Sequence, residues 1–196
     1  MDNSKKIILD LCGGTGSWSK PYKEAGYDVR VITLPEYDVR TYTPPEGVYG
    51  ILAAPPCTMF SIVRTTAKKP RDFKEGMEIV EACEQIIRHC RYRGKLAFWA
   101  MENPRGYLQQ FIGRPTYEFD PTEFGDKHNK KTQIWGYFNK PVKTHEYKKT
   151  GSHAITNRYF EKLPDDYVRD PNMRLDAIKR SITPQGFAKA FFKVNR

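Results

Sequence analysis

The chain has 196 residues, 39% of them hydrophobic and 13% aromatic, a composition that fits one folded α/β domain and excludes a disordered chain. No apolar run approaches the roughly 20 residues needed to cross a bilayer, which excludes a membrane-spanning helix. Thirty-three basic side chains against 23 acidic ones leave a net charge of +10, and this excess favours a polyanionic partner.

Short apolar runs alternate with helical stretches in the first half of the chain, which predicts a parallel sheet built from strand–helix–strand units. The apolar run near the start lacks a small-residue cleavage site, so we expect a strand there and not an export signal. The protein is therefore expected inside the cell, with its four cysteines as free thiols. The elements expected in this half are strands at Ile7–Leu11, Asp28–Leu34 and Tyr49–Ala53, a helix over 18–25 that ends at Gly26, and a weaker extended stretch around 38–39.

The second half is predicted to contain two helices and two strands, separated by less regular segments. Residues 58–72 have no clear period and are expected to form a long mobile loop. The last helix is expected to have Thr183 as its N-cap and Pro184 in its first position. Residues 139–182, rich in Lys, Asn, Asp and Pro, predict no regular element. The expected elements are the helix Phe73–Arg93, the strands Lys95–Met101 and Lys131–Phe138, and the final helix from 184 onward.

A glycine-rich turn, Cys12-Gly13-Gly14-Thr15-Gly16, directly follows the first predicted strand and its Asp10. Glycine lets the backbone turn tightly and approach a ligand closely, and open α/β sheets bind cofactors at the carboxyl end of the first strand. The alternative is a plain reversal of the chain. No Gly-Lys-Ser/Thr follows, which disfavours a phosphate-binding Walker loop. Glu36 and Asp38 are the nearby carboxylates that could bind a cofactor hydroxyl or an adenine amine.

The third predicted strand runs into Pro55-Pro56-Cys57. Because proline restricts the backbone, Cys57 is well placed for nucleophilic attack, and the basic residues of the following loop would favour its thiolate. The alternative for any cysteine is a small buried hydrophobe, which suits Cys83 and Cys90 on the predicted helix. No second Cys/His pair at close spacing accompanies them, so no metal site is expected.

Glu102-Asn103-Pro104 follows the fourth predicted strand. A carboxyl group at the end of a buried strand, beside the same cleft, can share a proton with the ring nitrogen of a bound base. The alternative is a surface glutamate before a turn.

Residues 127–149 carry seven lysines against one glutamate, interleaved with aromatic rings. Cations that hold phosphates beside rings that stack on bases are typical of a nucleic-acid surface. Some of these rings must instead be core residues of a strand. The rings are Trp135, Tyr137, Phe138 and Tyr147.

Taken in order, these motifs resemble the cytosine carbon-5 DNA methyltransferase family, particularly its small phage-type members. DLCGGTG is similar to the first motif of that family, APPC to its catalytic motif and MENP to its Glu-Asn motif, while KKTQIWGYF and ITPQGFAKAF resemble its basic and closing motifs. The resemblance runs from residue 7 to about residue 192. It implies one Rossmann-like, S-adenosylmethionine-dependent methyltransferase domain over 1–196, α/β with a mostly parallel sheet and helices on both faces, in which 139–182 is a reduced target-recognition or variable insert.

The resemblance also implies that Cys57 adds to carbon 6 of cytosine while Glu102 binds nitrogen 3 and the exocyclic amine. The partner would be double-stranded DNA with the target cytosine flipped out, and the loop 58–72 would close over it. A monomer without metal or membrane is expected, in the cytoplasm of a bacterial or phage-infected cell. The implied residues are Cys57, Glu102, Asn103 and Pro56 for catalysis; Asp10, Cys12, Gly13, Gly14, Gly16, Trp18, Asp38, Pro55 and Thr183 for S-adenosylmethionine; and Arg64, Lys68, Lys69, Arg71, Lys130 and Lys131 for DNA.

The chain departs from the family pattern in three places. Cys12 stands where the family has an aromatic residue, and Lys130, Lys131, Thr132 and Gln133 stand where its basic motif has two arginines. Only about forty residues separate the basic-motif strand from the last helix, so we expect sequence specificity that is short, relaxed or provided by residues 139–175. Two other interpretations stay open: a transferase that modifies pyrimidines of RNA or of nucleotides, and a basic nucleic-acid-binding module without turnover.

Overall fold

The computed structural model describes residues 2–65, 67–94, 96–150 and 175–196, together with positions 163, 167, 169 and 171. Its six strands form one sheet in the order β2-β1-β3-β4-β6-β5, which confirms the predicted, mostly parallel α/β sheet. The parallel strands are β1 (Ile7–Leu11), β2 (Asp28–Ile32), β3 (Val48–Ala53) and β4 (Phe98–Pro104); β6 (Thr132–Tyr137) runs antiparallel to both of its neighbours, β4 and β5 (Tyr117–Phe119).

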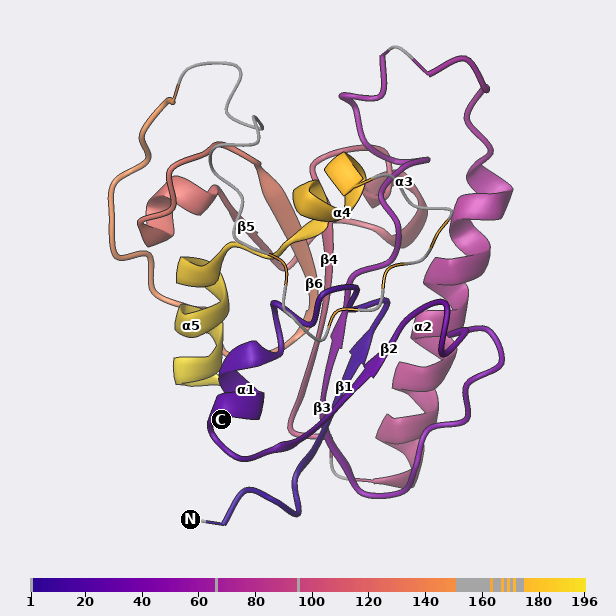
Figure 1. Cartoon of the computed structure of the whole chain (residues 1–196), viewed down its shortest axis with the longest axis vertical. Helices are drawn as coiled ribbons and strands as arrows, with labels where there is room; N and C mark the ends of the chain where they lie inside the picture. Colours follow the sequence, from indigo (N-terminus) through magenta and orange to yellow (C-terminus); the bar gives the residue numbers. More distant parts are fainter. Residues whose placement is uncertain are drawn as a thin grey trace.

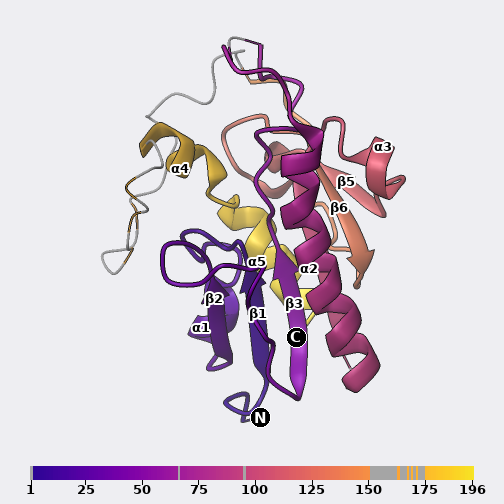
Figure 2. The same ribbon diagram turned by 90° about the vertical axis from the view of Figure 1, so that its right-hand side faces the viewer.

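Helices cover both faces of this sheet (Figure 1). The long helix α2 (Phe73–Arg93) covers one face, as Figure 2 shows from its own side, and α1 (Lys20–Glu24) and α5 (Gln185–Val194) cover the other. Successive side chains of a strand point to opposite faces. In β1, Leu9 therefore packs in the core beneath α2, whereas Ile8 packs in the core beneath α5.

The core beneath α5 is built mainly from aromatic rings. The rings of Phe119 and Phe187 stack with their centroids 3.8 Å apart, and Trp18 packs against Phe187 and Phe191 at 6.0 and 5.5 Å. Trp18 is only 2% exposed and comes directly after the glycine turn. The last helix therefore supports that turn from inside the molecule.

Two helix boundaries differ from the sequence-based expectation. The first helix begins at Lys20 and not at residue 18, because proline, with its fixed φ, stands in its first turn and Trp18 is drawn into the core. The last helix begins at Gln185 with Pro184 as its N-cap, so Thr183 is not the cap.

Strand β4 extends farther along the chain than expected. It begins at Phe98 and includes Glu102 and Asn103, because β6 continues to pair with it: Glu102 lies opposite Ile134, and Asn103 opposite Gln133. Lys95, the expected first residue of this strand, lies outside the described residues. The weak extended stretch expected around 38–39 leads into a turn and joins no strand.

Four short elements were not expected from the sequence. Three of them lie between β4 and β6, and the fourth lies inside the variable segment 139–182, most of which falls outside the described residues. The four elements are α3 (Gln109–Ile112), β5, the 3-10 helix η1 (Pro121–Phe124) and α4 (Leu175–Ser181).

No helix in the described part of the chain is long and apolar enough to cross a membrane.

The strand order reverses direction at β1, because β2 lies on one side of it and β3 on the other. In open α/β sheets a ligand binds beyond the carboxyl ends of the strands at such a switch point. The glycine turn follows β1, the proline turn follows β3, and Glu102 lies in the last part of β4, so all three sequence motifs meet at this edge.

Candidate active site

The glycine turn after β1 lies directly against the carboxyl group of Asp10. A Cβ atom added at Gly13 would lie 2.4 Å from Cγ of Asp10, so only glycine fits there. Cys12, Gly14 and Gly16 have positive φ angles of 54°, 54° and 66°, and the amide of Gly16 donates to the carbonyl of Gly13 at 2.9 Å. Such a turn makes a concave backbone surface able to receive a ligand.

Asp10 is fully buried, and only one of its two carboxyl oxygens accepts a hydrogen bond. The Ser19 hydroxyl donates to its Oδ2 at 2.5 Å, whereas its Oδ1 has no protein partner. Burial raises the pKa of Asp10 to about 6, and the Ser19 hydrogen bonds oppose that rise. A buried acceptor without a protein partner suits a ligand that carries amine or hydroxyl donors.

The proline turn after β3 exposes a half-buried thiol. Pro55 is buried and Pro56 is exposed, and the carbonyl of Cys57 accepts from the amides of Phe60 and Ser61 at 3.0 and 2.8 Å. These bonds hold the backbone that follows the thiol in a tight turn. Burial raises the pKa of the Cys57 thiol, the positive charge of Lys130 lowers it, and the negative charge of Glu102 raises it.

Strand β4 is tied to the proline turn by Asn103. The fully buried Asn103 donates from Nδ2 to the carbonyl of Pro55 at 2.9 Å, and its Oδ1 has no partner. The next residue back, Glu102, has a side chain that is 13% exposed, and its Oε1 lies 3.6 Å from Nζ of Lys130. Glu102 and Cys57 thus belong to one electrostatic cluster that Lys130 shares.

The sequence offers all four residues 130–133 in place of the two arginines of the basic motif. In the structure their side chains lie in different environments. The side chain of Lys131 is 50% exposed and its Nζ lies 3.6 Å from Oε2 of Glu118. Gln133 is buried and donates to Oε1 of Glu118 at 2.6 Å. The Thr132 hydroxyl donates to the carbonyl of Lys130. Within this stretch, Lys130 is the residue that pairs with Glu102.

The segment after Cys57 is more firmly attached than the expected mobile loop. Phe60 is fully buried, and Arg71 donates to the carbonyls of Met59 and Ser61, both at 2.8 Å, while its guanidinium lies 5.0 Å from the ring centre of Tyr107. Arg71 therefore binds within the segment itself.

The other basic residues of this segment that are expected to contact DNA differ in their contacts and in their exposure. Arg64 donates to the carbonyl of Lys69 at 2.7 Å, and Lys69 forms an ion pair with Glu75 at 3.1 Å. Lys68 is exposed. Arg64 is thus engaged inside the segment, whereas the two lysines present their side chains at the surface.

Three of the expected cofactor residues are engaged by other parts of the protein. Asp38 accepts hydrogen bonds from both Nε and Nη2 of Arg40, and these bonds lower the pKa of that carboxyl. Thr183 is buried, and its amide donates to the hydroxyl of Ser17 at 2.8 Å, which ties α5 to the glycine turn. The ring of Trp18 lies in the core, so its side chain supports the turn from below.

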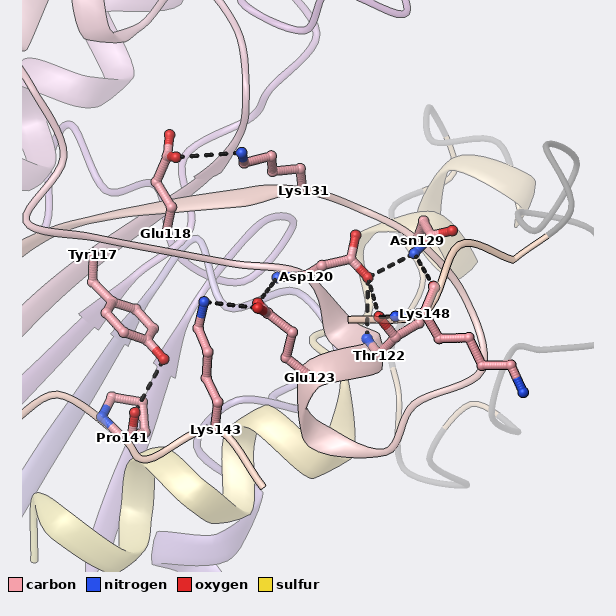
Figure 3. A network of polar contacts seen from close by, with 10 residues as sticks. All are labelled: Tyr117, Glu118, Asp120, Thr122, Glu123, Asn129, Lys131, Pro141, Lys143 and Lys148. Carbon is pink, nitrogen blue, oxygen red and sulfur yellow. Dashed lines mark hydrogen bonds and ion pairs between the residues drawn. The ribbon is translucent and has the colours of Figure 1, made fainter. Parts of the chain in front are cut away.

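A polar network holds the basic segment 139–150 beside η1 (Figure 3). Oδ1 of Asp120 accepts from Thr122 and from Asn129, and Asn129 also donates to the carbonyl of Lys148. Lys143 pairs with Glu123 at 2.8 Å.

The aromatic rings of the basic region divide between core and surface, as expected. Trp135 is 5% exposed, whereas Tyr137 and Tyr147 are 70% and 59% exposed. Phe138 packs against Phe191 in the core beneath α5. The two exposed tyrosines are the rings available at the surface.

The structure adds three residues that sequence reasoning missed. Ser19 binds Asp10, Ser17 binds Thr183, and the carbonyl of Arg180 accepts from Nζ of Lys130 at 3.4 Å. The two serines follow the glycine turn closely and could have been suspected as its partners. Arg180 lies in the variable segment, where no pattern pointed to it.

The remaining cysteines occupy apolar positions. Cys83 and Cys90 are buried on α2, which confirms that they pack as small hydrophobes, and Sγ of Cys12 lies 4.0 Å from Sγ of Cys83. In the part of the chain that the structure describes, no three His, Cys, Asp or Glu side chains are grouped so that they could hold a metal ion.

The fold and the site together define an open α/β protein whose three motifs lie at the switch point of its sheet. No protein-family model matches the chain, and no curated protein matches it. Among solved structures it is similar to one described as a candidate DNA modification methyltransferase encoded within a prophage of E. coli, with 14% sequence identity and a TM-score of 0.49. The match covers 67% of this chain and 46% of that one, so this chain spans less than half of that protein's length. A similarity this low assigns neither a family nor a substrate.

Proposed function

We propose that this protein is an S-adenosylmethionine-dependent methyltransferase that modifies carbon 5 of cytosine in double-stranded DNA through a covalent adduct with Cys57. The observation that carries the proposal is the Asn103–Pro55 hydrogen bond, which holds the strand of Glu102 against the turn of Cys57. A nucleophile and a carboxyl group beside a glycine turn suit this chemistry, and the order of the motifs along the chain resembles that family.

The residues around the glycine turn fit S-adenosylmethionine. Asp10 offers an unpartnered buried oxygen, Gly13 packs directly against its carboxyl group, and the space beside Gly14 is open. We propose that Gly14 and Gly16 bind the cofactor through their backbone, with Cys12 and Pro55 at the rim of its site. When bound, S-adenosylmethionine supplies an electrophilic methyl group. Asp38 would contact the cofactor through oxygens that Arg40 already binds.

The chemistry then follows from the two residues at the strand ends. The thiolate of Cys57 adds to carbon 6 of cytosine, which makes carbon 5 nucleophilic. Glu102 takes up a proton from water and passes it to nitrogen 3, and it also binds the exocyclic amine, so that charge does not accumulate on the ring. After carbon 5 has been methylated, loss of its proton and of the Cys57 sulfur restores the aromatic ring.

DNA is the proposed partner because of the net charge of +10 and the lysines of the segment 127–149. A cytosine stacked in a duplex cannot reach a half-buried thiol, so the target base would be rotated out of the helix. We propose that the chain acts as a monomer and as a single domain over 1–196, with 139–182 as its reduced recognition insert.

Transfer of an isotopically labelled methyl group tests the proposal. Purified protein is incubated with labelled S-adenosylmethionine and DNA, and the nucleosides are separated by mass spectrometry; labelled 5-methylcytosine is expected. Cys57→Ala abolishes the product and retains cofactor binding, whereas Cys90→Ala on α2 retains activity. Parallel reactions with RNA and free cytidine nucleotides identify the acceptor. Absence of label in every acceptor would refute the assignment as an enzyme.

A further inference from the structure

Lys130 is more enclosed than a lysine that binds phosphate at a surface. Its side chain is 16% exposed, against 50% for the neighbouring Lys131. Burial of a lysine is costly unless its charge has partners. Nζ of Lys130 has two, Oε1 of Glu102 at 3.6 Å and the carbonyl of Arg180 at 3.4 Å.

These two partners come from distant parts of the chain. Glu102 lies on β4, whereas Arg180 lies in the last turn of α4. Lys130 itself precedes β6, and the Thr132 hydroxyl donates to its carbonyl at 2.7 Å. The ammonium group is therefore held from both sides, and its position depends on the tertiary fold.

The turn of Cys57 lies against the same cluster, because Asn103, the neighbour of Glu102 on β4, donates to the carbonyl of Pro55 at 2.9 Å. Among the charges that act on this thiol, Lys130 has the largest effect and favours the thiolate; Glu102 opposes it, and Arg180 adds a smaller favourable effect. A thiolate in a partly buried site needs a nearby positive charge, because burial alone disfavours it.

We propose that Lys130 is a positioning residue of the active site, which stabilises the thiolate of Cys57 and orients the carboxylate of Glu102, and that it is not a phosphate contact. The inference rests on the proposed function for the role of Cys57. The bond chemistry is simple: the thiol loses its proton to water, and the resulting sulfur anion is stabilised by the fixed ammonium group. The neighbouring Lys131, whose charge faces Glu118, has no part in this.

Alkylation of Cys57 by iodoacetamide tests the assignment without DNA or cofactor. The rate is followed by mass spectrometry of the peptide that contains Cys57, over a range of pH. We expect Lys130→Met to move the pH–rate profile to higher pH and to slow alkylation near neutral pH by about tenfold, because the rate follows the thiolate fraction. Lys130→Arg should restore most of the rate, and Lys131→Met should match the wild type.

A second variant tests the same electrostatic cluster, and the expected shift of its pH–rate profile has the opposite sign. Glu102→Gln removes the negative neighbour, so its profile should move to lower pH even if Lys130→Met proves difficult to fold. An unchanged profile in Lys130→Met that retains its fold, or an equal shift in Lys131→Met, would overturn the inference. If the profiles shift as expected and no acceptor is methylated, the proposed function fails and the assignment of Lys130 stands.

Discussion

The buried amide of Asn103 on β4 donates to the carbonyl of Pro55, in the turn after β3, at 2.9 Å, and so joins two adjacent parallel strands at their carboxyl ends. Asn103→Ala leaves that carbonyl buried without its donor, so we expect a loss of about 1–3 kcal/mol in the free energy of unfolding. Methyl transfer should fall more than cofactor binding, because the turn of Cys57 loses its support. Asn3→Ala is the matched control: it also removes a bond to a distant carbonyl, that of Ala25, but before the amino end of β1. Equal losses of activity in both variants would contradict the role of Asn103.

Two glycines of the turn after β1 should respond differently to alanine. At Gly13 a methyl group would collide with the Asp10 carboxylate, so Gly13→Ala should abolish cofactor binding, which isothermal titration calorimetry measures directly. At Gly14 the space is open and the penalty comes from its φ of +54°, about 1–2 kcal/mol in unfolding free energy. A Gly13→Ala variant that binds the cofactor as well as Gly14→Ala does would argue against the close contact.

The raised pKa of Asp10 makes stability depend on pH in an unusual direction for a carboxyl group. Its pKa is about 6 in the folded protein against an ordinary value of 3.8, so between these values the folded state holds a proton that the unfolded state has lost. Its contribution to stability is therefore present at low pH and is lost as pH rises through 6.

Asp10→Asn isolates this contribution. Between about pH 4.5 and pH 7.5 the wild type should lose about 2 kcal/mol of unfolding free energy that the variant does not lose. Urea unfolding of both proteins at the two pH values provides the comparison, because the other titrating groups cancel in the difference. An identical pH dependence of the two proteins would show that the pKa of Asp10 is not raised in the folded state.

Arg71 should be needed for the order of the segment that follows Cys57. Its guanidinium binds two backbone carbonyls and faces the Tyr107 ring, so Arg71→Ala should lower the free energy of unfolding by about 1–3 kcal/mol and speed limited proteolysis between residues 62 and 70. Arg88→Ala, which removes an exposed pair with Glu84 on α2, should change stability by less than about 1 kcal/mol. Unchanged cleavage in Arg71→Ala would show that the segment is held by other contacts.

The positions of the three motifs could be predicted because each lies beside a buried apolar run that glycine or proline ends. The runs before the glycine turn and before the proline turn have no other stable place than a parallel sheet with both faces covered. Their carboxyl ends then meet at one edge, which is where the structure has Asp10 and Asn103.

The partners of the charged side chains could not be predicted in this way. Lys130 and Lys131 are adjacent and chemically identical, yet one faces Glu102 and the other Glu118. Glu102 pairs with Ile134 and Glu118 with Gln133, and because successive residues of a strand point to opposite faces, the two carboxylates lie on opposite faces of the sheet. The sequence does not reveal this register. Short elements such as β5 are equally hidden, because three residues contain no repeat from which a strand can be recognised.

The antiparallel strand β6 lies between β4 and β5, although β5 precedes it in the chain. Residues 117–119 consequently have no hydrogen-bonding neighbour in the sheet until residues 132–137 have left the ribosome. This half of the protein must therefore assemble out of order during synthesis: a nascent chain halted between these two strands would display an unpaired edge at β4, open to pairing with another nascent chain.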